Sequence, residues 1–278
     1  MGSPNPVYSD RLKALGYKIH HETLVKLDGT PFVYNIHATN RTLNESHYET
    51  VYDCLNQLIF NRLETECGMV PLTVPIDAQK GEPTIPVLMT RNALKEPRPL
   101  LLLLPGSNQS IGYWTGKIAI NENVFKGSML EYTHRAHASG YSVLILNSNQ
   151  NSVATGQIVR GSEDPVSHVD YVWEYVVRGA VTESVCVVAF SYGGVCIQKL
   201  DRLRKLKGVA LADSVHHRVR NPVFEKLAVN FKCSDEELGK NLGLDNVGVQ
   251  TYSSGTSDHG HAAIVAIDEI FKFLKNVI

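Results

Sequence analysis

The sequence lacks long apolar runs and any marked excess of charge. No apolar stretch approaches the ~20 residues that a helix needs to cross a bilayer, so we expect no membrane span. The opening residues MGSPNPVYSD lack the basic, apolar and small-residue order of a secretory signal, which favours an intracellular protein. Lys and Arg number 27 against 28 Asp and Glu, which leaves a formal net charge of −1. A chain so balanced has no overall attraction for a polyanion, and we expect no direct binding to nucleic acid.

Cysteine is scarce and irregularly spaced. The five cysteines are an odd number, include no CxxC pair and mostly lie in apolar surroundings, as reduced thiols in a core do. Adjacent histidines occur at His20-His21 and His216-His217, but the sequence has no HExxH motif and no Cys/His set with the spacing of a zinc site. We therefore expect a reducing compartment, no metal and no cofactor.

The length and the apolar content allow one large core. The chain has 278 residues, of which 43% are hydrophobic, and single α/β domains reach about 250 residues. No internal repeat or low-complexity tract divides it. We expect one domain over residues 1–278, in which residues 1–69 form a helix-bearing N-terminal extension.

Short apolar runs alternate with helical patterns along the chain. Continuous apolar runs, typical of strands buried on both faces of a parallel sheet, begin at Leu101, Tyr141 and Val185. The predicted strands cover residues 30–36, 70–76, 84–89, 101–108, 141–149, 185–191, 207–212 and 247–253. The predicted helices cover residues 45–67, 127–138, 166–180, 193–200 and 262–278, and the polar stretch 149–165 is expected to be a surface loop or flap. This order predicts an α/β-hydrolase-like, doubly wound, mostly parallel sheet with helices on both faces.

A serine stands at the sharpest of these predicted strand-to-helix turns. Ser191 follows a buried strand, and Gly193 and Gly194 open the next helix. The segment AFSYG resembles the nucleophile elbow G-x-S-x-G, with Ala189 in place of the first glycine. Taken alone, the motif fits equally well an ordinary tight turn that contains a serine.

Residues further along the chain favour the elbow. In this fold the acid and the base follow the serine in the order Asp, His, each at a strand end on the same edge of the sheet. Asp213 ends one predicted strand, and His259 follows the last one. An imidazole there would take the proton of Ser191, and a carboxylate on its other nitrogen would hold it in the correct tautomer. The alternatives left open are His261 as base and Asp245 or Asp258 as acid.

An oxyanion formed at the serine would need two hydrogen-bond donors. The backbone N–H of Tyr192, directly after the serine, is the first candidate. The second is expected from the loop after the strand at Leu101, where Gly106 and Ser107 permit a close approach. Many proteins of this architecture have His-Gly in that loop, whereas this chain has Pro105 before Gly106.

Dispersed motifs give the chain a family resemblance over nearly its whole length. They are GTPFVYN from Gly29, VPLTVPIDA from Val70, the W…INEN stretch from Trp114 to Asn123, GYSVLILNSN from Gly140, FSYGG from Phe190, ALADSVHH from Ala210 and SSGTSDH from Ser253. With these motifs the chain resembles the argonaute-binding-protein-two domain family, which includes animal cotranscriptional regulators and the C-terminal domain of some fungal class II histone deacetylases. The resemblance implies an α/β-hydrolase-type fold and places the family's serine, aspartate and histidine at Ser191, Asp213 and His259. Pro105 departs from the histidine of animal relatives, and the charged insertion that many of them carry after the Asn147 region is missing.

Two functions follow from the resemblance and the residues. The first is a regulatory or scaffold protein in small-RNA silencing or chromatin-linked RNA processing, working in the nucleus, the cytoplasm or both. Its expected partners are Argonaute-type, chromatin or histone-deacetylase proteins. The alternative is an active serine hydrolase that cleaves an ester, thioester or amide through an acyl-serine intermediate.

Overall fold

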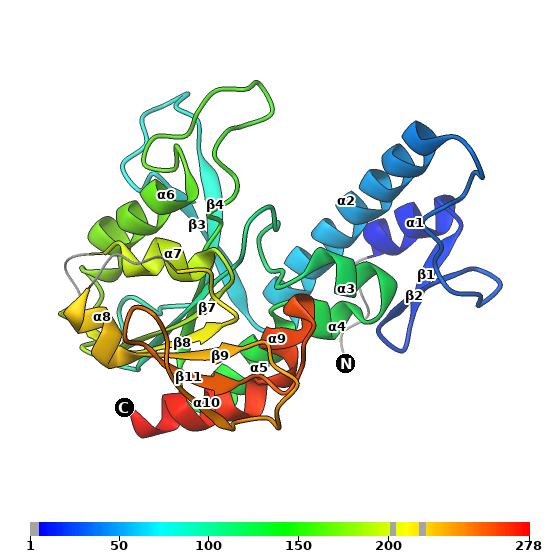
Figure 1. Ribbon diagram of the computed structural model, residues 1–278. Helices are drawn as coiled ribbons and strands as arrows, with labels where there is room; N and C mark the ends of the chain where they lie inside the picture. The colour runs from blue at the N-terminus through cyan, green and yellow to red at the C-terminus, as the bar shows by residue number, and fades with distance from the viewer. Residues whose placement is uncertain (1–5, 201–203, 217–220) are drawn as a thin grey trace.

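A large sheet forms the body of the molecule. The computed structural model describes residues 6–200, 204–216 and 221–278, and over these residues nine strands pair in the order β10-β11-β9-β8-β7-β5-β6-β4-β3 (Figure 1). The strands are β3 Met69–Val74, β4 Ile85–Thr90, β5 Leu100–Leu104, β6 Ser142–Ile145, β7 Val185–Phe190, β8 Leu206–Ala212, β9 Ala228–Lys232, β10 Asn241–Leu244 and β11 Gln250–Ser253.

The centre of this sheet is parallel and its two ends are antiparallel. β6, β5, β7, β8, β9 and β11 pair in parallel, whereas β10 pairs antiparallel with β11, and β4 pairs antiparallel with both β3 and β6. The carboxyl ends of the parallel strands therefore meet at one edge. This arrangement confirms the predicted α/β-hydrolase-like, mostly parallel sheet.

Apolar side chains fill both faces of the sheet. Leu101 and Leu103 of β5 belong to one core cluster, and Leu100, Leu102 and Leu104 belong to the other, because successive side chains of a strand point to opposite faces. Helices α2, α5 and α10 pack on the first face, and α6, α7 and α8 pack on the second (Figure 1). All five leucines are buried, and each contributes roughly 2 kcal/mol of transfer free energy.

The predicted helices are present with shifted ends. The helices are α1 Pro6–Ala14, α2 Arg41–Thr65, α3 Gly116–Asn121, α4 Val124–Gly127, α5 Leu130–Ala138, α6 Pro165–Val172, the π-helical turn η1 Trp173–Val177, α7 Gly193–Gln198, α8 Pro222–Leu227, the 3₁₀ turn η2 His259–His261, α9 Ala262–Val265 and α10 Ile267–Asn276. Helix α2 begins before the predicted residue 45 because Asn40 caps it, its side chain accepting a hydrogen bond from Leu43 N at 3.0 Å.

The predicted strand over residues 30–36 is wrong. Pro31 forms only an isolated bridge, and the segment instead packs aromatic rings on α2, Phe32 and Tyr34 both contacting Tyr48. The strands of this region are β1 Tyr17–His20 and β2 Thr23–Lys26, a small separate hairpin. Its turn residues His21 and Glu22 both have positive φ, without the Asn-Gly sequence that signals such a turn.

The end of the sheet also differs from the sequence prediction. The strand predicted over residues 247–253 is confined to β11, because the Asp245 carboxylate accepts hydrogen bonds from Val247 N and Val249 N and holds those residues in a turn. Neither β9 nor β10 was predicted. β9 has the polar Asn230 and Lys232 within it, and β10 is exposed along its length.

The N-terminal extension lies to one side of the sheet. The hairpin and the outer part of α2 project away from the body in Figure 1. Leu12 and Tyr17 nevertheless share one apolar cluster with Leu101 of the central strand. The division of the chain into one domain with an extension over residues 1–69 stays a prediction.

The polar stretch 149–165 is anchored at several points. The Asn151 amide donates to Ser148 O and Ser162 O, and Arg160 pairs with Asp77 and Glu82. The fully buried His168, on helix α6, makes a further contact with this stretch. Its Nε2 accepts from Asn147 N at 3.2 Å, so the neutral ring carries its proton on Nδ1 and donates it to Ser162 Oγ at 2.8 Å. The stretch is therefore a surface loop tied to the body of the protein.

Replacing Gly193 by alanine should destabilise the fold. A Cβ at this position would lie 2.7 Å from Pro105 O and 2.9 Å from Leu104 O, which are backbone atoms that cannot move aside cheaply. We expect the free energy of unfolding to fall by about 1–3 kcal/mol, measured by denaturant titration. Gly179→Ala is the matched control, because the nearest atom to its added Cβ is Val176 O at 3.9 Å. Equal stability of the two variants would contradict the predicted clash.

Buried His168 should make stability depend on pH. Burial lowers the pKa of His168 to about 4, whereas the imidazole of the unfolded chain keeps a pKa near 6.5. Between these values the unfolded chain binds more protons, so the free energy of unfolding should decrease as the pH falls through this window, by up to about 3 kcal/mol. Denaturant titrations at several pH values should show this loss for the wild type and not for His168→Gln. Parallel pH profiles for the two proteins would refute the assignment.

Candidate functional site

Ser191 lies on a sharp turn between β7 and α7. Its φ is +51°, a left-handed conformation that is uncommon for a residue other than glycine. Ser191 N donates to Ala212 O at 3.0 Å, which ties the turn to the end of the neighbouring strand β8. Such strain, on the order of 1–3 kcal/mol, persists only where the surroundings impose it, and it is a feature of nucleophile elbows.

Asp213 and His259 meet at the same edge of the sheet. Asp213 directly follows β8, and His259 begins η2 after the last strand. The Asp213 Oδ2 to His259 Nδ1 distance is 2.5 Å, so the carboxylate orients the imidazole. The second carboxylate oxygen, Oδ1, accepts from Cys233 N at 2.9 Å, which fixes the aspartate in turn.

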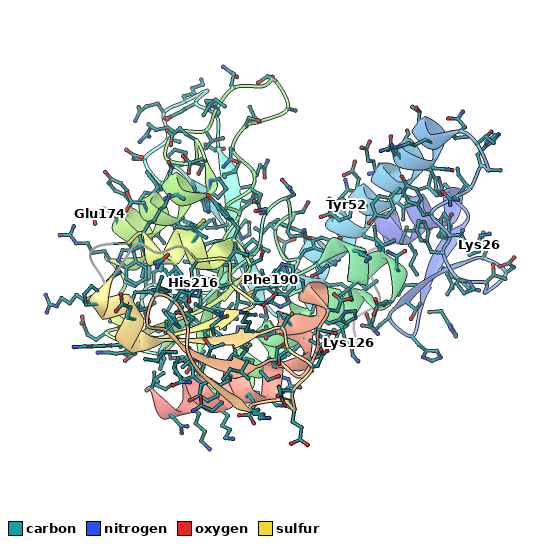
Figure 2. All side chains as sticks on the ribbon, viewed as in Figure 1. Lys26, Tyr52, Lys126, Glu174, Phe190 and His216 are labelled. Carbon is teal, nitrogen blue, oxygen red and sulfur yellow. The ribbon has the colours of Figure 1, made fainter. Side chains whose placement is uncertain are left out.

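The serine and the histidine are neighbours without a direct hydrogen bond. The ring of Phe190, the residue before the serine, lies 4.8 Å from the His259 ring between centroids. Figure 2 shows Phe190 in the middle of the view, between His216 and Tyr52. Within the described part of the chain no hydrogen bond joins Ser191 Oγ to His259, whose side chain is 48% exposed. The structure thus pairs the predicted acid with the predicted base and leaves the serine hydroxyl unbonded to that base.

The alternative acids and bases have partners of their own. His261 bonds Glu122 at 2.8 Å and lies 3.3 Å from Asp258. Burial lowers the pKa of His261, but the hydrogen bond to Glu122 and the nearby carboxylates together raise it above its ordinary value. Asp245 bonds His216 at 2.7 Å, away from His259.

The loop after β5 approaches the serine closely. A Cβ on Gly106 would lie 3.1 Å from Ser191 Cβ, so any larger residue here would have to displace the serine or Phe190 by a few tenths of an ångström. No described residue accepts a hydrogen bond from the backbone N–H of Tyr192, Gly106 or Ser107, the three predicted oxyanion donors.

Sequence reasoning missed the residue that holds this loop. Asn149 Nδ2 donates to Gly106 O at 2.8 Å and to Gln109 O at 3.0 Å, while its Oδ1 accepts from Asn108 N at 3.2 Å. The signal was a polar residue just after a buried parallel strand, β6, at the edge where sites form in this class of sheet.

Cys233 was also missed as a neighbour of the acid. Asp213, Cys233 and His259 offer ligand atoms within 4.8 Å of one another, the donor types that a zinc ion accepts. Burial, and then the hydrogen bond to Asp213, raise the pKa of the Cys233 thiol to about 12, so the sulfur is protonated at neutral pH. The adjacent pair His20-His21 makes a ring contact, and His217 lies outside the described residues.

Comparison with known proteins places these residues in a family context. Residues 8–158 and 152–222 match the family model described as the Arb2 domain. The human protein named Cotranscriptional regulator ARB2A is 25% identical over 334 residues, covering 96% of this chain and 80% of the human protein. A FAM172 family protein homolog of Caenorhabditis elegans is 27% identical over 281 residues, covering 95% of this chain and 86% of that protein.

Solved structures show the same fold at low identity. The histone deacetylase Clr3 superimposes with a TM-score of 0.53 at 13% identity, over 82% of this chain and 39% of that one. A histone deacetylase from Saccharomyces cerevisiae superimposes with a TM-score of 0.50 at 13% identity, over 86% of this chain and 100% of the other. Among the described helices, none has the length and apolarity to cross a membrane. Since the family model matches well over half of its residues, this chain belongs to the Arb2 domain family.

Proposed function

We propose that this chain is a regulator of transcription-linked processes that works in the nucleus as a protein-binding platform. The observation that supports it best is similarity along 96% of the chain to a protein named for cotranscriptional regulation. The likeness in fold to two histone deacetylases favours chromatin proteins as partners. Within this role we further propose small-RNA silencing or chromatin-linked RNA processing, with Argonaute-type proteins among the partners.

The geometry of the serine supports a platform over an enzyme. A serine hydroxyl is a weak nucleophile until a base removes its proton during attack. Ser191 Oγ makes no hydrogen bond to His259, although Asp213 already holds the ring. The absence of a bond from the hydroxyl to this acid–base pair supports the platform.

A partner assay tests the platform. Affinity purification of the tagged chain from cells should recover chromatin or Argonaute proteins equally well with the wild type and with Ser191→Ala, because deleting one hydroxyl removes no partner surface. Mass spectrometry of the recovered proteins measures this. Absence of both classes would contradict the proposed role. Loss confined to Ser191→Ala, at unchanged melting temperature, would show that the pocket itself binds the partner.

A serine hydrolase remains the second candidate, supported by the 2.5 Å Asp213–His259 hydrogen bond and the elbow conformation of Ser191. In this function a rotation of the half-exposed His259 side chain brings its Nε2 to the hydroxyl. The imidazole takes the proton as Ser191 Oγ attacks a carbonyl carbon, and the N–H groups of Tyr192 and the Gly106 loop stabilise the oxyanion.

Labelling with a fluorophosphonate separates the two functions. An active site would form a bond from Ser191 Oγ to phosphorus with loss of fluoride, detected by intact-protein mass spectrometry. His259→Ala should then abolish labelling, and Asp213→Asn should slow it by up to about 10⁴-fold. The matched control His261→Ala should label like the wild type, since this ring bonds Glu122. No labelling of folded wild type would exclude the hydrolase and favour the platform.

A further inference from the structure

An open cavity lies beside the Gly106 loop, the segment that follows β5. Its volume is about 510 Å³, within the range of roughly 300–1,000 Å³ typical of ligand sites. Two loops at the carboxyl edge of the sheet and helix α2 supply its walls. The lining residues are Asn56, Asn108, Gln109, Ser110, Ile111, Asn147, Asn149 and Gln150.

The chemistry of this amide-lined cavity is uniform. Six of its eight lining residues carry a carboxamide, and none carries a charge or an aromatic ring. Each carboxamide offers both a donor and an acceptor in one plane. The wall therefore suits a ligand that is uncharged and that itself presents donors and acceptors side by side.

Hydrogen bonds hold the wall in place before any ligand arrives. Asn149 fastens the Gly106 loop through Gly106 O, Gln109 O and Asn108 N. Gln109 Oε1 accepts from Gly116 N at 2.8 Å, and Ser110 N donates to the hydroxyl of Tyr52 on α2 at 3.3 Å. A fixed wall reduces the entropy lost on binding.

Several polar atoms of the wall are left without partners. Asn147 is 2% exposed, and its Nδ2 donates to Pro86 O and Gln150 Oε1, but its Oδ1 accepts nothing from the described residues. The Gln150 Nε2 group donates to no described residue either. Asn56 Oδ1 is buried and unpartnered over the same part of the chain. An acceptor without a donor in a largely buried side chain is costly, so a ligand that supplies an N–H group to Asn147 Oδ1 gains affinity here.

We propose that the amide-lined cavity binds the main-chain amides of an uncharged peptide segment. Amide pairs with amide through a donor and an acceptor at once, which matches the free atoms of Asn147 and Gln150. A nucleotide fits less well, because the lining offers neither a ring for stacking nor a cation for phosphate. The inference deepens the proposed regulatory function, on which it rests for its biological meaning, by naming the chemistry of a partner.

The cavity shares the Gly106 loop with the elbow. Gly106 N–H faces no described acceptor, Gly106 O is held by Asn149, and the same residue packs on Ser191. A peptide seated on the carboxamides therefore reaches toward the serine without needing its hydroxyl, so binding should survive Ser191→Ala.

The test uses a neutral probe, N-acetylglycylglycine amide, and the full chain. Saturation-transfer NMR titrations should give equal Kd values for the wild type and Ser191→Ala. Asn56→Leu and Gln150→Leu each replace a carboxamide of the lining by an apolar side chain, and each should weaken binding about tenfold. The matched control is Asn61→Leu. Asn61 also lies on α2 with a buried, unpartnered Oδ1, but it does not line the cavity. Both helix variants should raise the melting temperature, and only Asn56→Leu should impair binding.

The outcomes separate the cavity from the regulatory function. Absence of saturation transfer at about 10 mM probe, or unchanged Kd in Gln150→Leu and Asn56→Leu, overturns the proposal. Tighter binding of adenosine than of the peptide amide overturns it in favour of a nucleic-acid base. Gln150 is exposed, so its variant remains informative if Asn56→Leu does not fold. Peptide binding without recovery of any partner from cells would refute the regulatory function and leave the cavity proposal standing.

Discussion

The close approach of helix α7 to the ends of two strands is the constraint on which the rest of the site depends. A side chain on Gly193 would meet the carbonyls of Leu104 and Pro105, and one on Gly194 would collide with Ser214 Oγ. The turn before the helix must therefore be short, and Ser191 takes the left-handed conformation that results. The strain is sustained because both flanking elements, β7 and α7, are buried in the core.

Around this turn the polar groups sort into separate hydrogen-bonded sets. Asp213 makes hydrogen bonds to the His259 ring and to Cys233 N. Asp245 makes hydrogen bonds to the His216 ring and to a backbone N–H group of its own turn. All four carboxylate oxygens of the two acids make hydrogen bonds, and none of these bonds comes from Ser191. The side chain of His259 is half-exposed. A fold of this kind can host either an enzyme or a binding platform, so the function depends on the site and not on the fold.

The cavity beside the Gly106 loop is lined by carboxamides and not by charged groups. Asn149 positions the loop that packs on Ser191, and Asn147 and Gln150 present the unsatisfied atoms. Recognition by neutral groups depends little on ionic strength, unlike recognition by surface charge. The proposed binding of a neutral peptide also suits a chain with almost no net charge, which exerts little long-range attraction on a charged partner.

The sequence by itself determined the parallel sheet, because runs such as Leu100–Leu104 are apolar at every position and only a strand buried on both faces accommodates them. It also predicted a tight strand-to-helix turn at Ser191, since two glycines follow the serine after one intervening residue. The assignment of Asp213, and not Asp245 or Asp258, to His259 was decided by tertiary structure, because strand register and turns fix which side chains meet. The hairpin of the N-terminal extension and the amide-lined cavity were likewise invisible in the sequence. Their residues carry no periodic pattern, and they acquire partners only when loops distant in the chain are brought together by the sheet.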